Sequence, residues 1–556
     1  MDAPRPERRD GRRFFTTTGP VKPDRHYCIP PLDRLDLDDV LALVGDEKYF
    51  VLHAPRQTGK TSALLALRDR LNADGYRCVY VNVEVAQTAR EDVGQAMRTV
   101  LGRLASQARM TLGDEFLDDV FRDLLARYAP HDVLLEALTR WAETDATPLV
   151  LLIDEIDMLI GDSLLAVLRQ LRTGYHQRPR SFPQSVVLCG VRDVRDYRIH
   201  SGSANATIAG GSAFNVKAKS LRLGDFSRDQ VLALLGQHTA ETGQAFTAAT
   251  LELVWGQTLG QPWLVNALAD DACFRHKAGR DRSRPIDAEA LRAAQERLIL
   301  RRETHLDQLA DKLREDRVRR VIEPLLSGAA ARTFTDRDLE YIRDLGLLAR
   351  GRPVRIANPI YAEVVPRELT WVVQEEFDQE TAWYVDTDGG LNVGALLTAF
   401  QTFFREHSEH WSKRFQYQEA WPQLLLQAFL QRVVNSGGRI EREYGLGRGR
   451  TDLLIVWPRS PRASDRGTRD GPSHAGGGDA LRVDKVVIEC KVLHGSLERT
   501  IAEGLEQTAA YMDRCAAQEG HLVIIDRAAE GRSRDEKVFR HRKTSRRGVV
   551  IDVWGM

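Results

Sequence analysis

Cysteine is scarce in this 556-residue sequence, and the few cysteines are scattered. The six positions are Cys28, Cys78, Cys189, Cys273, Cys490 and Cys515, and no two of them form a Cys-x-x-Cys pair. This pattern argues against a disulfide framework and against a cysteine-based zinc site. It favours a reducing compartment, and we therefore expect the protein to be cytoplasmic.

Long apolar runs and a net charge are also missing. The apolar runs, such as Leu149–Ile153 and Val486–Ile488, have the length of strands, whereas a membrane-spanning helix needs about 18 apolar residues in succession. The segment Met1–Arg13 is polar and basic and lacks the apolar core of a secretory signal. Lys plus Arg (79) equal Asp plus Glu (79), so any affinity for nucleic acid must come from local patches. We expect no membrane partner.

The chain is too long for a single hydrophobic core, so we expect several domains. From Tyr49 to about Ser220, apolar strand-like runs alternate with longer helical stretches. The runs are Tyr49–His53, Cys78–Val85, Leu149–Ile153 and Val186–Cys189. Strands separated by helices predict an α/β fold with a parallel sheet covered on both faces.

The first of these strands leads into a phosphate-binding pattern. The residues in question are Ala54, Pro55, Arg56, Gln57, Thr58, Gly59, Lys60, Thr61 and Ser62. Gly59 lets the backbone approach phosphate oxygens, Lys60 can reach the β- and γ-phosphates, and the Thr61 hydroxyl can ligate Mg²⁺. A chance Gly-Lys-Thr is the alternative, and the first glycine of the usual P-loop is replaced by Ala54. The strand before the loop and the helix-forming run after it favour an ATP site.

A second pattern completes this site. The buried run Leu149–Ile153 ends in Asp154 and Glu155, and a parallel strand delivers its last residues to the ligand edge of the sheet. Asp154 can bind Mg²⁺ through water, and Glu155 can orient and deprotonate the attacking water. The alternative is a solvated acidic turn, since Asp157 and Asp162 follow. The preceding P-loop favours the catalytic interpretation.

These residues resemble the AAA-like branch of P-loop ATPases, close to the archaeal-type and STAND-related ATPases. The resemblance implies ATP and Mg²⁺ as cofactors, ATP hydrolysis as the activity, an ATPase core over residues 25–220 and a helical lid over 221–301. It places Arg192 at the polar sensor that follows the next strand, and the segment Gly260–Trp263 at a turn of the lid. Residues 1–24 are expected to be a disordered tail.

The middle of the chain resembles a winged-helix domain over residues 302–370, followed by a helical connector over 371–414. The pattern predicts a helix from Leu306 to Ile322 ended by Pro324, a second helix from Asp336, and a short hairpin. Arginines on the first helix could contact phosphates. They could equally form the solvated face of a helix that packs against the lid.

A further group of residues with catalytic potential lies near the C-terminus. Asp452 begins one apolar run, while Glu489 and Lys491 end another and share one face of a strand because strand side chains alternate. If the two strands are neighbours, two carboxylates and an ammonium converge. Such a set suits Mg²⁺ or Mn²⁺ acting on a phosphodiester, with Lys491 stabilising charge on the phosphate.

This arrangement resembles the PD-(D/E)XK nuclease superfamily and covers residues 415–556. The resemblance implies a restriction-endonuclease-like α/β domain, with Gln507 and Tyr511 matching a helical motif of the RecB-like branch. Glu419 could supply a further acidic residue, although Glu441 or Glu443 could fill that place. Residues 459–483 have the composition of a disordered insertion. The basic run Arg540–Arg547 is either a solvated tail or a phosphate contact.

The whole pattern predicts an ATP-binding protein, a Mg²⁺-dependent ATPase that controls a nuclease-like domain able to bind and cleave DNA. The alternative is a nucleotide-dependent switch that binds a partner and keeps a catalytically silent nuclease-like scaffold. The sequence leaves the cleavage preference and the oligomeric state open.

Overall fold

The computed structural model divides into two compact units, which are described separately. The N-terminal unit comprises Met1–Asp307, Leu339–Pro353 and Ala357–Ile360, and the C-terminal unit comprises Gln308–Asp338, Val354–Ile356 and Tyr361–Met556. The structure describes residues 13–193, 198–201, 206–209, 214–301, 304–313, 315–326, 334–369, 384–386, 389–402, 426, 430, 439–442, 453–458, 483–493, 495–526 and 537–556.

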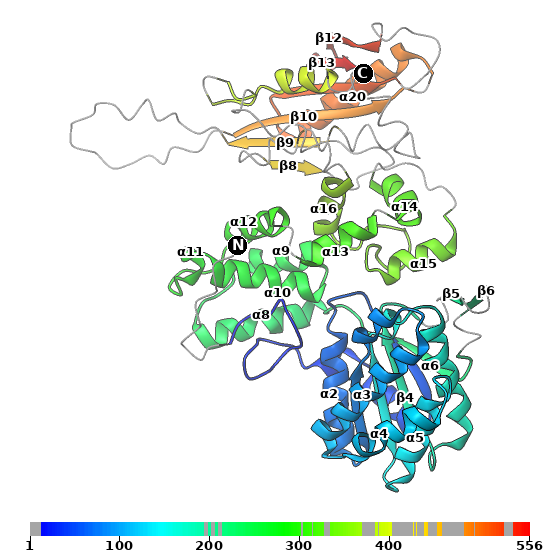
Figure 1. Cartoon of the computed structure of the whole chain (residues 1–556). Helices are drawn as coiled ribbons and strands as arrows, with labels where there is room; N and C mark the ends of the chain where they lie inside the picture. Colours follow the sequence, from blue (N-terminus) through cyan, green and yellow to red (C-terminus); the bar gives the residue numbers. More distant parts are fainter. Residues whose placement is uncertain are drawn as a thin grey trace. The chain divides into compact units, whose positions relative to one another are not determined.

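A five-stranded sheet forms the centre of the N-terminal unit (Figure 1). Its strands are β1 (Tyr49–His53), β2 (Arg77–Asn82), β3 (Leu149–Asp154), β4 (Ser185–Gly190) and β7 (Lys217–Arg222). Their order is β2-β3-β4-β1-β7, and every neighbouring pair is parallel. The predicted parallel α/β sheet is thus confirmed. A separate antiparallel pair is formed by β5 (Arg198–Ser201) and β6 (Ala206–Ala209).

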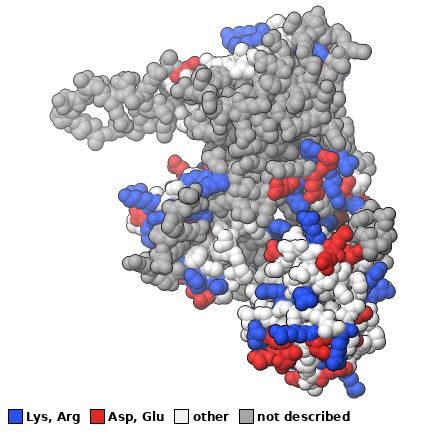
Figure 2. All heavy atoms as spheres, viewed as in Figure 1, with Lys and Arg blue, Asp and Glu red and all other residues white. Residues whose placement is uncertain are grey.

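Helices cover both faces of this sheet, which explains why its central strands are buried along their whole length. One face packs against α1 (Leu37–Gly45) and α2 (Lys60–Ala73). The other packs against α3 (Val93–Leu112), α4 (Phe116–Arg127), α5 (Val133–Glu143) and α6 (Gly161–Gly174). Short helical turns lie at η1 (Pro31–Arg34), η2 (Glu84–Ala89), η3 (Ile156–Met158) and η4 (Tyr175–Gln177). Basic and acidic side chains lie interspersed over this part of the visible surface (Figure 2).

Helices follow β7 in the expected lid region. They are α8 (Arg228–Thr242), α9 (Ala248–Thr258), α10 (Pro262–Asp270), the π-helical turn η6 (Asp271–Arg275), α11 (Lys277–Arg280) and α12 (Ala288–Leu300). Helix α8 begins with a capping box in which Ser227 and Gln230 exchange hydrogen bonds. The Gln261 side chain caps the N-terminus of helix α10 by accepting a hydrogen bond from the Leu264 amide, and Pro262 occupies the first helical position.

Residues 1–24 were expected to form a disordered tail, and this prediction is wrong for residues 13–24. The Arg13 side chain forms an ion pair of 2.9 Å with Glu241 of α8, and the indole of Trp263 donates to the Thr17 carbonyl at 3.1 Å. Phe15 and Tyr27 are buried, because both aromatic rings pack beside His238. Contacts with residues that lie more than two hundred positions further along the chain therefore order this polar segment. Residues 1–12 lie outside the described part.

The expected middle domain, 302–370, is divided between the two units. Its helices are α13 (Thr304–Leu313), α14 (Asp316–Leu326), α15 (Asp336–Asp344) and α16 (Pro359–Leu369). The single helix predicted from Leu306 to Ile322 is instead two helices, and Pro324 lies inside the second. The expected hairpin is represented by a hydrogen bond of 2.9 Å from the Ala357 amide to the Leu347 carbonyl.

The C-terminal unit contains a six-stranded mixed sheet, in the order β12-β13-β11-β10-β9-β8. The strands are β8 (Arg439–Arg442), β9 (Leu453–Pro458), β10 (Val483–Val492), β11 (Glu519–Ile525), β12 (Phe539–Thr544) and β13 (Val550–Gly555). Strand β10 runs parallel to β11 and antiparallel to β9. Helix α20 (Leu497–Cys515) packs on one face, and Leu396, Phe400 and Leu426 pack on the other. Apart from Val483, the expected insertion 459–483 lies outside the described residues.

Within the described residues, no helix combines the length and the apolarity needed to cross a bilayer.

Candidate nucleotide-binding site

The loop between β1 and α2 has the backbone of a phosphate-binding loop. Gly59 takes a left-handed conformation with φ of 89° just before the first residue of α2, a conformation that favours glycine. The positive end of α2 and its unpaired amides then face the loop, as anion binding requires. Ala54, which replaces the usual first glycine, is fully buried, and its amide bonds to the Gly190 carbonyl at 3.2 Å.

The Lys60 side chain turns back into the loop. Its ammonium donates to the carbonyls of Ala54 (3.0 Å) and Pro55 (3.1 Å), and only 5% of the residue is exposed. The Thr58 hydroxyl also donates to the Pro55 carbonyl, at 2.8 Å. The loop therefore holds a positive charge at its centre, where phosphate oxygens would otherwise be repelled by the backbone carbonyls.

Thr61 and Asp154 lie side by side, as the sequence predicts. The Thr61 hydroxyl donates to Asp154 Oδ2 at 2.8 Å, and Asp154 is fully buried. The Glu155 amide donates to the other carboxylate oxygen at 3.0 Å. A hydroxyl and a carboxylate are the hard oxygen donors that Mg²⁺ prefers, so these residues fit the magnesium of MgATP.

A residue missed in the sequence also reaches Asp154. The Tyr80 hydroxyl on β2 donates to Asp154 Oδ2 at 2.9 Å. The pairing register of β2 with β3 places Tyr80 opposite Leu152, two residues before Asp154. A polar aromatic residue near the end of the neighbouring strand is the signal that could have suggested this contact.

Glu155 occupies a position suited to proton transfer. It adopts a left-handed backbone with φ of 57°, an uncommon conformation for a non-glycine residue that occurs often at functional sites. Burial raises the pKa of its carboxyl above its ordinary value; the positive charge of Lys60 opposes this shift, and the negative charges of Asp154 and Asp157 reinforce it. A carboxyl with a raised pKa is a better proton acceptor at neutral pH than an exposed one.

The segment after β4 is fixed by buried polar contacts. The Val191 amide donates to Asp157 Oδ2 at 3.1 Å, and the buried Asp193 accepts from Lys217 at 2.7 Å and from Ser220. Arg192, the expected sensor, lies between these residues along the chain. Its guanidinium carbon lies 5.0 Å from the centre of the Tyr341 ring.

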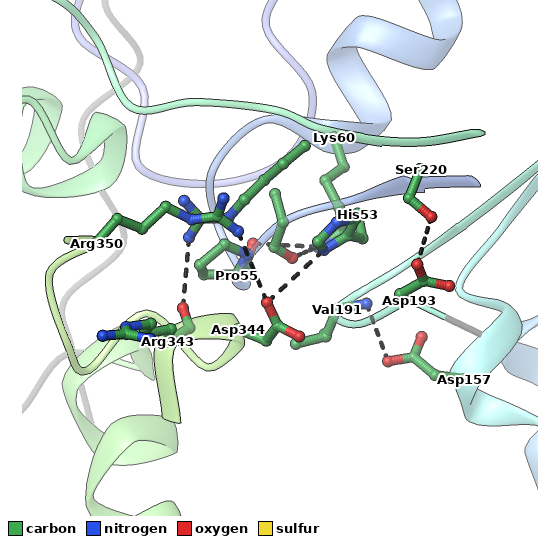
Figure 3. A network of polar contacts seen from close by, with 12 residues as sticks. His53, Pro55, Lys60, Asp157, Val191, Asp193, Ser220, Arg343, Asp344 and Arg350 are labelled. Carbon is green, nitrogen blue, oxygen red and sulfur yellow. Dashed lines mark hydrogen bonds and ion pairs between the residues drawn. The ribbon is translucent and has the colours of Figure 1, made fainter. Parts of the chain in front are cut away.

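Tyr341 belongs to a segment, Leu339–Pro353, that contacts the phosphate-binding loop (Figure 3). Gly346 approaches so closely that an added Cβ would lie 2.9 Å from the Pro55 ring. Asp344 Oδ1 lies 3.9 Å from His53 Nδ1, at the end of β1, and Arg350 lies 3.9 Å from the same carboxylate. Burial lowers the pKa of His53 to about 4. At neutral pH the histidine is therefore uncharged, and its contact with Asp344 is not an ion pair.

The expected site in the C-terminal unit is partly assembled. Glu489 and Lys491 are 2% and 6% exposed, and their charged groups are 2.8 Å apart. The Lys491 ammonium also donates to the Gln507 side chain of α20, and Tyr511 is buried one turn further along that helix. Strand alternation puts Glu489 and Lys491 on the face that α20 covers, with Val487.

The acidic residues expected to complete that site are not all described. Asp452, Glu419 and Glu443 are outside the described residues. Glu441 lies on β8, where it pairs with Leu454 of β9. Cys490 is buried on the opposite face, where burial raises the pKa of its thiol. Among the residues that the structure describes, no three His, Cys, Asp or Glu side chains form a ready metal site.

Comparison with known proteins supports the interpretation of the N-terminal unit. Residues 44–197 match the family model described as an AAA domain, which supports an ATPase-like P-loop domain in this part of the chain. The match spans β1 to β4 with both carboxylates and does not extend to the C-terminal sheet. No curated protein gives a significant match.

Solved structures that match part of this chain include a Walker-type ATPase of Pyrococcus abyssi, at 14% identity over 63% of this chain and 99% of that one, with a TM-score of 0.43. Cdc6p of Pyrobaculum aerophilum is 16% identical over 63% of this chain and 95% of its own, with a TM-score of 0.34. The Thermotoga maritima RuvB Holliday junction branch migration motor is 14% identical over 64% and 99%, with a TM-score of 0.32.

Proposed function

We propose that the chain hydrolyses MgATP and uses the nucleotide to control its C-terminal unit, which binds and cleaves DNA. The observation that carries the ATPase part is the 2.8 Å contact between Thr61 and Asp154. It supports a shared magnesium ion beside a triphosphate held by the loop amides and Lys60. A bound magnesium ion would neutralise charge on the phosphates. Glu155, next to Asp154 and carrying a raised pKa, would orient water and take its proton.

Two variants test the ATPase roles separately. Lys60→Ala removes the positive charge from the loop, so nucleotide binding is expected to be lost. Glu155→Gln keeps the side-chain shape but cannot accept a proton, so MgATP binding is retained while turnover falls. Turnover like that of the wild type in the Glu155 variant would refute its proposed role.

The segment Leu339–Pro353 is our candidate for the control element. It contacts Pro55 and His53 beside the phosphate-binding loop. It is also continuous in sequence, at both ends, with residues of the C-terminal unit. A change in the loop when nucleotide binds would therefore alter the packing of Gly346 and Asp344. The expected winged-helix character of residues 302–370 and the sensor role of Arg192 are part of this proposal.

The nuclease part rests on the group of Glu489, Lys491 and Gln507, the order of strand, Glu-x-Lys strand and helix, and the exposed basic strand β12. In β12, Arg540, Arg542 and Lys543 are exposed, as a contact with a phosphate backbone requires. Asp452 would complete the metal site for Mg²⁺ or Mn²⁺. The competing function is a nucleotide switch with a silent scaffold. The ammonium of Lys491 is already engaged by Glu489 and Gln507, which favours that alternative.

One experiment distinguishes the two functions. Plasmid and single-stranded DNA are incubated with the full chain, ATP, and Mg²⁺ or Mn²⁺, beside Lys491→Ala and the paired variant Glu489→Gln/Lys491→Met. ATPase activity of the same preparations reports whether the N-terminal unit is folded. Cleavage by the wild type that both variants lose supports the nuclease. ATP turnover without cleavage under either metal supports the switch.

A further inference from the structure

The magnesium-binding carboxylate of the proposed site is held by a third group outside the loop. Asp154 Oδ2 accepts hydrogen bonds from Thr61 and from the Tyr80 hydroxyl, while Oδ1 accepts one from the Glu155 amide. Together these three hydrogen bonds restrain both oxygens of the carboxylate. Of the three, Tyr80 is the only one that belongs neither to the phosphate-binding loop with its helix nor to the end of β3.

The sheet itself brings Tyr80 to this place. Strand β2 pairs with β3 in the register Tyr80 with Leu152 and Asn82 with Asp154. Alternate residues share a face, so Tyr80 and Asp154 both project toward the side of the sheet that α2 covers. Tyr80 packs there in the same core as Leu152 and Leu64. The packed core therefore holds the Tyr80 ring in place, with its hydroxyl next to the Asp154 carboxylate.

The chemistry of the phenol suits a permanent donor. Tyr80 is 9% exposed, and its hydroxyl lies 2.9 Å from Asp154 Oδ2. A phenol carries its proton at neutral pH and can therefore donate to the carboxylate. When the Thr61 oxygen turns toward a metal ion, the Tyr80 hydroxyl can continue to hold the carboxylate in the same plane.

We propose that Tyr80 is a positioning residue that orients Asp154 toward the magnesium ion of MgATP. The inference rests on the proposed function of the site and adds to it a residue on a strand that supplies neither the phosphate-binding loop nor the acidic pair. Partners that orient a metal-binding group typically contribute ten- to a hundred-fold to metal affinity. The competing role for Tyr80 is core packing alone.

The test compares two conservative variants of the full chain. Tyr80→Phe removes only the hydroxyl. Tyr49→Phe is its matched control, because Tyr49 is a fully buried tyrosine of the same sheet whose hydroxyl donates to the Pro183 carbonyl at 3.0 Å. Tyr49 begins β1, whereas the phosphate-binding loop follows the end of that strand. Both variants lose one buried hydrogen bond, so a general loss of stability affects them alike.

Two quantities are measured for each protein. The first is the affinity for a fluorescent ATP analogue in EDTA and across a Mg²⁺ titration. The second is the Mg²⁺ concentration that gives half-maximal ATP turnover. In Tyr80→Phe the half-saturating Mg²⁺ concentration should rise about tenfold in both assays, with unchanged nucleotide affinity in EDTA. In Tyr49→Phe both values should equal those of the wild type.

The outcomes separate the inference from the function on which it rests. Equal Mg²⁺ dependence in Tyr80→Phe and wild type overturns the positioning role, and so does an equal shift in both variants. A wild type that binds MgATP without turnover contradicts hydrolysis only, because the binding titration still tests Tyr80. A wild type that binds no ATP overturns both.

Discussion

Replacing Lys491 by alanine should destabilise the C-terminal unit far more than the loss of a surface ion pair would. The Lys491 ammonium lies 2.8 Å from the Glu489 carboxylate, and the two side chains are 7% and 3% exposed. Removing one partner of a buried pair leaves the other charge uncompensated, at a cost of about 3–5 kcal/mol. The alanine variant used to test cleavage therefore also tests folding.

Protonation of the remaining carboxyl limits this cost. Protonating a glutamate whose ordinary pKa is about 4.3 costs about 1.4 kcal/mol per pH unit, hence about 3.7 kcal/mol at pH 7. In the variant a buried carboxyl holds its proton more tightly when folded than when unfolded, so the variant regains stability relative to the wild type as the pH falls. We expect a loss of about 3–4 kcal/mol at pH 7 and about 1.6 kcal/mol at pH 5.5.

Amide hydrogen exchange in β10 and β11 measures this effect in the C-terminal unit separately from the ATPase unit. The control is Arg499→Ala, which breaks an ion pair of the same 2.8 Å length on the exposed face of α20 and should leave exchange unchanged. In Glu489→Gln/Lys491→Met, most of the stability should return, because no charge is left buried. A loss below about 1 kcal/mol at pH 7 in Lys491→Ala, or an equal loss at both pH values, would contradict an uncompensated buried charge on Glu489.

Three further predictions concern the nucleotide site, the control segment and the basic strand. Glu155→Gln should lower ATP turnover about a hundredfold or more at unchanged MgATP affinity. In a pH–rate profile, wild-type turnover should fall on acidification at a pH above the ordinary glutamate pKa, because burial raises the pKa of Glu155. Gly346→Ala should increase hydrogen exchange in residues 339–353 more than Gly351→Ala, because both have positive φ but only Gly346 faces Pro55; equal effects would contradict the contact. Arg542→Ala should weaken DNA binding for all sequences and reduce the slope of its salt dependence by about one, and an unchanged slope would exclude β12 as the contact.

The juxtaposition of the residues in the candidate nucleotide site could be predicted because these residues are local in sequence. Gly59, Lys60 and Thr61 follow one strand directly, and Asp154 ends another, so a parallel sheet alone brings them to one edge. The contact of Tyr80 depends on the register between β2 and β3, which lie about seventy residues apart along the chain. A single sequence contains no direct signal for that register.

Contacts between segments far apart in sequence also explain where other predictions differ from the structure. Residues 13–28 are ordered by rings and charges of α8 and α10 that lie more than two hundred residues further on. The neighbour of Arg192 is Tyr341, in a segment that the sequence assigned to a separate domain. In the C-terminal unit, the alternation in β10 was enough to predict that Glu489 and Lys491 share one face of the strand. Gln507 was named only through the resemblance, and a nuclease site depends on Asp452 as well.

Calorimetric titration of the full chain with ATP in the presence of Mg²⁺, for the wild type and for Lys60→Ala, tests the proposed MgATP site. The predicted result is saturable binding at one site in the wild type and none in the variant, because Lys60 is the positive charge at the centre of the loop. A wild type that binds no ATP, or a variant that binds it equally well, would contradict the proposed MgATP site.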